Sequence, residues 1–146
     1  PFERLTRPAG DYPMMRFPWV EVRAALGDLA SHAGAGEPVH LAYVNPETGL
    51  ECMPILGFSA IMLRPGETIS PTRRSASAGW LVVEGAGESE VDGVAIAWEQ
   101  GDVIASPTHA RIRHRNGSAR KPAYLIQIDD APLQRKIGIY EEFAVA

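Results

Sequence analysis

Residues 101–116 read GDVIASPTHARIRHRN, and this stretch carries the clearest strand pattern in the sequence. Two sets of residues alternate within it: one set is Ala110, Ile112 and His114, and the other is Arg111, Arg113 and Arg115. A period of two is typical of a β-strand with one face toward a core and the other toward water. The pattern predicts a strand over residues 110–115 whose arginines are exposed and whose histidine, His114, points into the interior.

Other short apolar runs flank this stretch, separated by turn residues at intervals of roughly 8–12 residues. We expect strands at 38–44, 57–64, 79–85, 95–98, 102–105 and 123–128, with a tight turn at 91–94 that joins two short strands. Many short strands with regular turns are typical of an all-β sandwich or barrel. A chain of 146 residues is long enough to bury one full core, so a single domain is predicted.

Two helices and an N-terminal arm are expected around these strands. Residues 19–31 place apolar side chains at steps of three and four, which predicts an amphipathic helix, and a short helix is expected from Pro132 to about Gly138. Residues 1–18 contain four prolines, which favour extended backbone. The predicted organisation is therefore a linker over residues 1–18, followed by one domain over residues 19–146.

The composition disfavours several classes of function. The 18 acidic residues outnumber the 14 basic ones and give a formal net charge of −4, whereas nucleic-acid binding requires a basic surface. The apolar runs are much shorter than the roughly 20 residues that a membrane span needs, so no membrane partner is expected. The single cysteine, Cys52, cannot form an intrachain disulfide, which favours a reducing, cytoplasmic location.

Glycine, proline and asparagine form a spaced framework on both sides of residue 101. Gly66 and Gly85 fit the pattern Gly-x5-His-x-His-x3/4-Glu-x6-Gly, and Gly101, Pro107 and Asn116 fit the pattern Gly-x5-Pro-x-Gly-x2-His-x3-Asn. These patterns are the two motifs of the cupin superfamily, which the sequence therefore resembles. The resemblance implies an all-β fold, the cupin double-stranded β-barrel or jelly-roll, in which histidine and glutamate side chains converge on one metal ion.

The residues at the ligand positions of these motifs differ from the family pattern. Counted along the motifs, the four positions fall on Thr72, Arg74, either Ala78 or Gly79, and Ile112. A mononuclear iron site needs imidazole and carboxylate ligands, and the permanent positive charge of an arginine repels a cation. We therefore predict that Thr72, Arg74, Gly79 and Ile112 mark a degenerate metal site and that this chain binds no metal.

An ordered series of short segments narrows the resemblance. The segments are FPW at 17–19, YVNPETG at 43–49, LRPG at 63–66, VVEGAG at 82–87, DDAPL at 129–133 and GIYEE at 138–142. They are similar to the C-terminal half of gentisate 1,2-dioxygenase and its salicylate and 1-hydroxy-2-naphthoate relatives. This resemblance implies a cupin domain of an Fe(II)-dependent dioxygenase that uses O₂ to cleave the ring of a hydroxylated aromatic acid.

The same resemblance has consequences for cofactors and partners. It implies that Fe(II) lies in an N-terminal cupin domain of the parent enzyme, and that the present barrel serves structure and oligomerisation. The expected partners are that N-terminal domain, further copies of the chain, or both, with residues 1–18 as the interdomain linker. No catalytic residue is assigned, because the family's catalytic residues belong to the other half, and this chain alone is not expected to be catalytic.

Arg74 and His114 remain as candidates for ligand binding inside the barrel. Arginine holds carboxylates through paired hydrogen bonds, and His114 is expected at an inward-facing position. The sequence therefore leaves open an alternative function, a stand-alone, metal-free cupin that binds a small carboxylate such as an aromatic acid. A purely structural interaction module also stays open. The remaining histidines, for which the sequence indicates no partner, are His32, His40 and His109.

Overall fold

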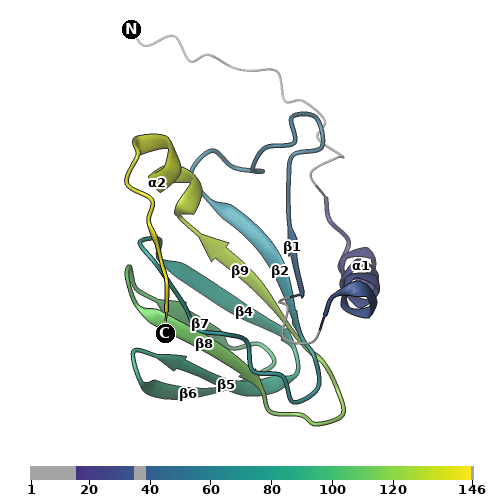
Figure 1. Ribbon diagram of the computed structural model, residues 1–146. Coiled ribbons are helices and arrows are strands. Elements are labelled where there is room, and N and C mark those ends of the chain that lie inside the picture. Colours follow the sequence, from purple (N-terminus) through teal and green to yellow (C-terminus); the bar gives the residue numbers. More distant parts are fainter. Residues whose placement is uncertain (1–15, 35–38, 146) are drawn as a thin grey trace, which may run out of the picture.

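The computed structural model describes residues 16–34 and 39–145, so most of the predicted linker, residues 1–15, lies outside the described part. In the described part, ten strands form two five-stranded antiparallel sheets (Figure 1). The first sheet consists, in spatial order, of β1 (Val39–Ala42), β2 (Gly57–Leu63), β9 (Ala123–Asp129), β4 (Ala78–Glu84) and β7 (Val103–Ser106). The second consists of β10 (Glu142–Phe143), β3 (Thr72–Arg74), β8 (Arg111–Asn116), β5 (Ala86–Val91) and β6 (Val94–Glu99).

The predicted all-β barrel with two helices is confirmed. Helix α1 spans Trp19–His32 and α2 spans Ala131–Ile137, each within two residues of its predicted bounds. The alternation of β8 is also confirmed, because its residues are exposed and buried in strict turn from Arg111 to Asn116. The turn at 91–94 joins β5 and β6, as expected.

The sequence did not delimit three of the strands: β3, β5 and β10. β3 and β10 have only three and two residues, too few to establish a period. β5 reads AGESEV, and the fully buried member of this strand is the polar residue Ser89, so the strand lacks an apolar face. Apolar alternation is therefore an incomplete guide where the barrel interior is itself polar.

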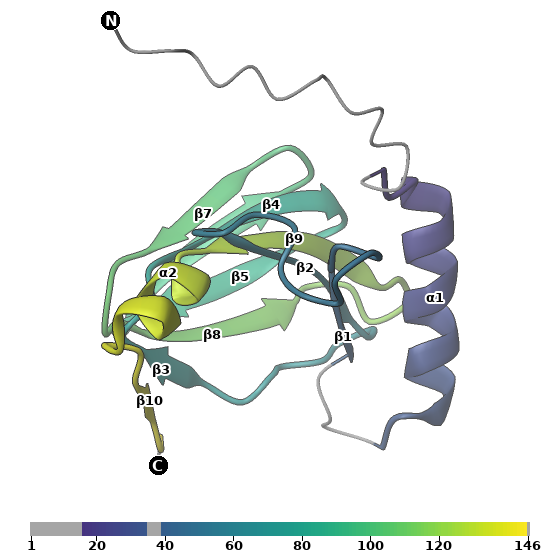
Figure 2. The same ribbon diagram turned by 90° about the horizontal axis from the view of Figure 1, so that it is seen from above.

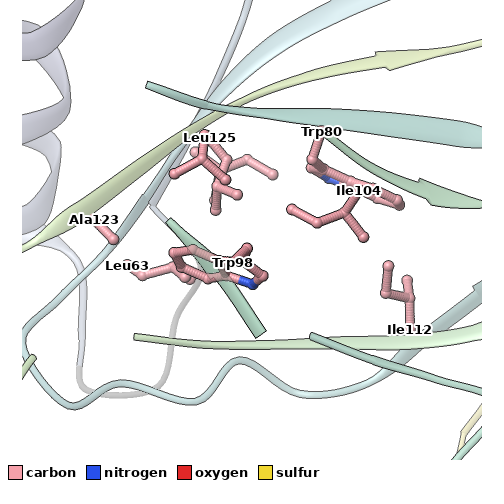
Figure 3. Packing of buried hydrophobic residues seen from close by; sticks show 9 residues of the cluster. Leu63, Trp80, Trp98, Ile104, Ile112, Ala123 and Leu125 are labelled. Atoms are coloured by element: carbon pink, nitrogen blue, oxygen red, sulfur yellow. The ribbon is translucent and has the colours of Figure 1, made fainter. Parts of the chain in front are cut away.

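The core lies between the two sheets. Trp80 and Ile104 from the first sheet meet Trp98 and Ile112 from the second, and all four are at most 5% exposed (Figure 3). Leu63, Ala123 and Leu125 complete the part of the cluster labelled in that view. Burial of this apolar surface, at about 25 cal/mol per Å², is the main term that holds the two sheets together.

Helix α1 covers one half of the outer face of the first sheet. Its buried residues Val22 and Leu26 pack with Val39, Ala60 and Tyr124, which come from β1, β2 and β9. The helix therefore lies along one side of the barrel, as Figure 2 shows.

The other half of this outer face, over β9, β4 and β7, carries exposed apolar side chains. Leu81, Val103 and Ile128 are 44%, 70% and 42% exposed, and Leu81 and Val103 are direct cross-strand partners. We call these three residues the open face.

Among the described helices, none combines the length and the apolar character that a membrane crossing requires.

Candidate functional site

The alternation of β8 places His114 inside the barrel, where the residue is 2% exposed. Its imidazole packs edge-on against the Trp80 ring, with the ring centroids 4.8 Å apart. Burial lowers the pKa of His114 from 6.5 to about 4, because an imidazolium ion would lose its hydration there. At neutral pH the imidazole is therefore uncharged, with a proton on one nitrogen only.

A buried hydrogen-bond chain favours one of the two neutral tautomers of His114. The indole Nε1 of Trp98 donates to Ser89 Oγ at 2.8 Å, and Ser89 Oγ lies 2.7 Å from His114 Nδ1. Within the part of the chain that the structure describes, Nδ1 is the one acceptor within reach of the Ser89 hydroxyl, so the tautomer with the imidazole proton on Nε2 is the one that lets Ser89 both accept from the indole and donate to His114. Among the described residues, the buried Nε2 atom has no hydrogen-bond partner.

His114 lines a cavity of about 170 Å³, which we call the inner cavity. Its apolar wall consists of Ile61, Ile69 and Trp80, and its polar lining includes Thr72, Arg74 and Gln127. Arg74 and His114, which the sequence singled out as candidates for ligand binding, therefore lie on the wall of the same cavity.

Arg74 stands at the rim of this cavity, and its side chain is 20% exposed. The nearest carboxylate atom is Asp129 Oδ2, at 3.7 Å from Nη1, which is longer than a direct hydrogen bond. The same Oδ2 accepts a 2.6 Å hydrogen bond from Gln127 Nε2, and Gln127 Oε1 accepts one from the Trp80 indole at 3.1 Å. Asp129 is thus held by Gln127 and leaves Arg74 only a loose ion pair.

The inner cavity adjoins a second, outer hollow of about 340 Å³, the outer vestibule, and the two share His40, Arg74 and Gln127 as lining residues. The vestibule is further lined by Tyr43, Asp129 and Arg135. Arg74 therefore stands where the vestibule meets the inner cavity, while the neighbouring Arg73 is exposed and donates to the His109 carbonyl at 2.8 Å. The structure agrees with the alternation of β3, which turns only one of the two arginines inward.

His40 belongs to this site although the sequence assigned it no role. Loss of hydration at the cavity mouth lowers its pKa, and the positive charge of Arg74 lowers it further, against the opposing effect of Asp129. Gln127, Ser89 and Trp80 were also missed as site residues. No local pattern links β1, β4, β5 and β9 to Arg74, because their proximity arises only from the order of strands in the two sheets.

The ligand positions of the cupin motifs also lie in this region. Thr72 pairs in register with Ile112, which is buried in the core, and Thr72 and Arg74 line the inner cavity. Of the two alternatives for the glutamate position, Ala78 packs against the interior cluster, whereas Gly79 alternates to the outer face between Ala105 and Ile128. The inward position is therefore Ala78, and the choice of Gly79 is corrected.

These residues do not fit an Fe(II) ion. A threonine hydroxyl, a guanidinium, a methyl group and an isoleucine side chain supply neither the imidazoles nor the carboxylates that such a site uses. In residues 16–34 and 39–145, no group of three or more histidine, cysteine, aspartate or glutamate side chains is arranged to hold a metal.

A larger hollow of about 780 Å³ lies elsewhere, along β5 and β6. Its charged residues Glu88, Glu99, Asp102 and Arg115 are all exposed, and Asp102 already accepts a hydrogen bond from the Glu99 backbone. Two arginines on the outer face of β8 lie opposite acids of β5: Arg115 opposite Glu88, and Arg113 opposite Glu90, with which it forms an ion pair. Water screens such exposed groups, so the cavity at His114 is the stronger candidate site.

Comparisons with known proteins agree with this architecture. The family model described as "Cupin domain" matches residues 60–129, which hold the strands from within β2 to the end of β9. The solved salicylate 1,2-dioxygenase from Pseudaminobacter salicylatoxidans superposes with a TM-score of 0.79 at 23% identity, over 87% of this chain and 38% of that one. The two facing sheets and this match define the class: the chain is a cupin domain.

Two curated relatives place the domain more closely. The chain is 38% identical over 130 residues to gentisate 1,2-dioxygenase of a Ralstonia species, a match that covers 89% of this chain and 37% of the relative. It is 40% identical over 151 residues to 5-aminosalicylate 1,2-dioxygenase of a Comamonas species, covering 97% and 40%. The chain thus contains a cupin domain whose homologues are gentisate-type dioxygenases, and it spans about two-fifths of the length of these relatives.

Proposed function

We propose that this chain is the metal-free cupin domain of a gentisate-type ring-cleaving dioxygenase and that its role there is structural. The observation that carries the proposal is the set of residues at the inward-facing ligand positions, Thr72, Arg74, Ala78 and Ile112. Arg74 places a permanent positive charge in the region where the motif expects a cation. In the proposed whole protein, which is cytoplasmic, an N-terminal cupin domain holds Fe(II), and the substrate is a hydroxylated aromatic acid that is cleaved with O₂.

The open face supports a role in assembly. Leu81, Val103 and Ile128 present an apolar surface on a sheet whose other half is already covered by α1. Contiguous apolar surface of this kind is typical of a protein–protein contact. We assign the contact to a second cupin barrel, either the N-terminal domain of the same protein or another copy of this chain. The chain covers 37% and 40% of the two relatives described above, which agrees with a partner barrel in the proposed whole protein.

Metal analysis tests the first part of the proposal. The chain is equilibrated anaerobically with Fe(II), freed of unbound metal by gel filtration, and analysed for iron. We expect no stoichiometric iron, because the four positions lack suitable donors. The matched control rebuilds the motif with Thr72→His, Arg74→His, Ala78→Glu and Ile112→His in one chain, to show that the assay detects iron in this barrel. About one iron per unaltered chain would overturn the proposal, since other residues would then hold the metal.

Light scattering over a range of concentrations tests the second part. We expect a mass above the 15.8 kDa of one chain, and we expect Val103→Glu to reduce it toward that value, because a charge on the open face opposes its burial. The control is Val94→Glu, at a residue that is 63% exposed on the other sheet. A single 15.8 kDa species at all concentrations, or equal effects of both variants, would contradict a contact through the open face.

The alternative function, binding of a small carboxylate, is favoured by one specific observation, the unpartnered Nε2 of His114. Binding of a carboxylate in the inner cavity is compatible with a structural role of the open face, because the two lie on opposite sides of the first sheet.

A further inference from the structure

We infer that the inner cavity is a binding site for a small organic acid with a compact apolar body, whose oxygen atoms accept hydrogen bonds from His114 Nε2–H and from the Arg74 guanidinium. The inference rests on the alternative function given above, binding of a small carboxylate, and adds the site and the kind of ligand; it does not depend on the structural role. It requires neither a metal nor a partner domain, because every group involved belongs to the barrel of this chain.

The first step of the argument concerns the deep wall of the cavity. The chain Trp98–Ser89–His114 holds the imidazole through Nδ1, and all of its groups are paired when the imidazole proton is on Nε2, which leaves Nε2–H as a donor. A buried donor without an acceptor is unfavourable, and more than nine-tenths of buried polar groups in proteins are paired. An oxygen acceptor in the cavity would satisfy Nε2–H.

The second step concerns the rim. Arg74 offers up to five N–H donors in a planar fork, and its charged neighbour Asp129 lies at 3.7 Å with its Oδ2 already bonded to Gln127. The remaining charged group on the cavity wall is Glu142, which is exposed and lies 3.5 Å from the Tyr140 hydroxyl. His40 is uncharged at neutral pH because its pKa is lowered. Asp129 and Glu142, the register partner of Arg74 on β10, both offset its charge. Among the described residues, however, the guanidinium has no hydrogen-bond partner, only the 3.7 Å ion pair, so its N–H groups can donate to a carboxylate.

The third step concerns size and shape. Ile61, Ile69 and Trp80 form an apolar wall, and aromatic and aliphatic walls bind the apolar body of a ligand. A volume of about 170 Å³ lies below the roughly 300–1,000 Å³ of sites for drug-sized ligands, so the ligand is small. A compact acid with one carboxylate and a flat or branched apolar body fits these constraints, and benzoate is a suitable probe.

The chain contains three tryptophans, which give three separate indole N–H signals in a ¹H–¹⁵N NMR spectrum. Trp80 lines the cavity, Trp98 is linked to His114 through Ser89, and Trp19 donates instead to Glu84 outside the barrel. On titration with benzoate we expect the Trp80 signal to move in a saturable way, the Trp98 signal to follow, and the Trp19 signal to stay. The ¹⁵N shift of His114 Nε2 should change with the same dissociation constant.

Two arginine variants make the test specific. Arg74→Gln keeps a long polar side chain but removes the charge, and we expect it to weaken benzoate binding about tenfold or more, as the loss of a charge-assisted hydrogen bond does. The matched control is Arg73→Gln, which alters the adjacent, outward-facing arginine and should leave the dissociation constant unchanged. The three unperturbed indole signals of each free variant confirm that it is folded.

Other probes decide the sign of the charge that the cavity accepts. Benzamide, which has the same shape without the charge, should bind about tenfold more weakly than benzoate or not at all. The inference is overturned if benzylamine binds and benzoate does not, if Arg74→Gln and Arg73→Gln have equal effects, or if no indole signal moves at millimolar benzoate. In each of these outcomes, Arg74 and His114 would not act as a pair of donors for a ligand.

Discussion

Substitution of Asn116 should destabilise the barrel strongly, because this side chain joins two separate segments of backbone. Asn116 ends β8 and is 1% exposed. Its Nδ2 donates to the carbonyls of Leu63, Arg64 and Lys121 at 3.2, 3.0 and 2.8 Å, and its Oδ1 accepts from the Ser118 N–H at 2.9 Å. The asparagine of the second cupin motif is thus a hydrogen-bond clamp between the end of β2 and the loop that leads into β9.

The magnitude follows from the groups that Asn116→Ala would leave unpaired. The two N–H groups of the amide are shared among three carbonyls and count as about two hydrogen bonds, and Oδ1 accepts one more. The variant therefore loses about three neutral hydrogen bonds, at about 1 kcal/mol each. Buried carbonyls that find no water add to this cost, which gives a total of about 3–5 kcal/mol. Since small domains are stable by only about 5–15 kcal/mol, the midpoint of urea unfolding, followed by tryptophan fluorescence, should fall markedly.

Asn116→Asp distinguishes the clamp from simple loss of volume. The aspartate keeps the shape but turns a donor into a negatively charged acceptor that faces three carbonyl oxygens. Its pKa should rise above the unfolded value of about 3.9, so this variant should be less stable at pH 7 than at pH 4 relative to the unaltered chain. The control is Asn45→Ala, whose side chain accepts one exposed hydrogen bond from Glu47 N, and which should cost about 1 kcal/mol or less. The reasoning would be refuted if Asn116→Ala lowered the free energy of unfolding by less than about 1 kcal/mol. It would also be refuted if Asn116→Asp were as stable at pH 7 as the unaltered chain.

Two further predictions concern glycine packing and pH. Gly87→Ala should cost several kcal/mol of stability or prevent folding, because a Cβ would lie 2.1 Å from the Arg115 carbonyl oxygen and 2.6 Å from the Trp98 ring. The control is Gly79→Ala, whose Cβ would lie 3.8 Å from its nearest neighbour and which should be nearly neutral in the same urea assay. His114 has a folded pKa of about 4 against 6.5 unfolded, so the unfolded state binds more protons between these values and stability falls as the pH drops from 6.5 to 4, by up to about 3 kcal/mol. His114→Gln should remove this part of the pH dependence, and equal slopes for the two proteins would contradict it.

The sequence predicts the fold well wherever one face of a strand is apolar or a turn residue is diagnostic. The alternation of β8 predicted the inward position of His114, and motif spacing led to Arg74. The polar chain behind His114 was not predictable in this way, because Ser89 looks like a surface residue on a strand that reads AGESEV. His40 and Gln127 reach the cavity through the order of strands in the first sheet, which no local pattern encodes.

The framework residues of the cupin motifs have physical roles that need no metal, which explains how the barrel retains the motif spacing under the proposed function. Gly66 and Gly101 have φ values of 69° and 94°, where a side chain is strained, and Asn116 clamps the end of β2 to the loop that leads into β9. At the glycine position of the second motif stands His109, which keeps the left-handed backbone with a φ of 62°, although this conformation is less favourable in energy for a histidine than for a glycine. Under the same proposal the ligand positions serve the barrel through packing and charge, which Thr72, Arg74, Ala78 and Ile112 can do without any metal-binding group. The polar lining of the inner cavity includes the neutral imidazole of His114 and the guanidinium of Arg74, the two groups on which the binding experiment depends.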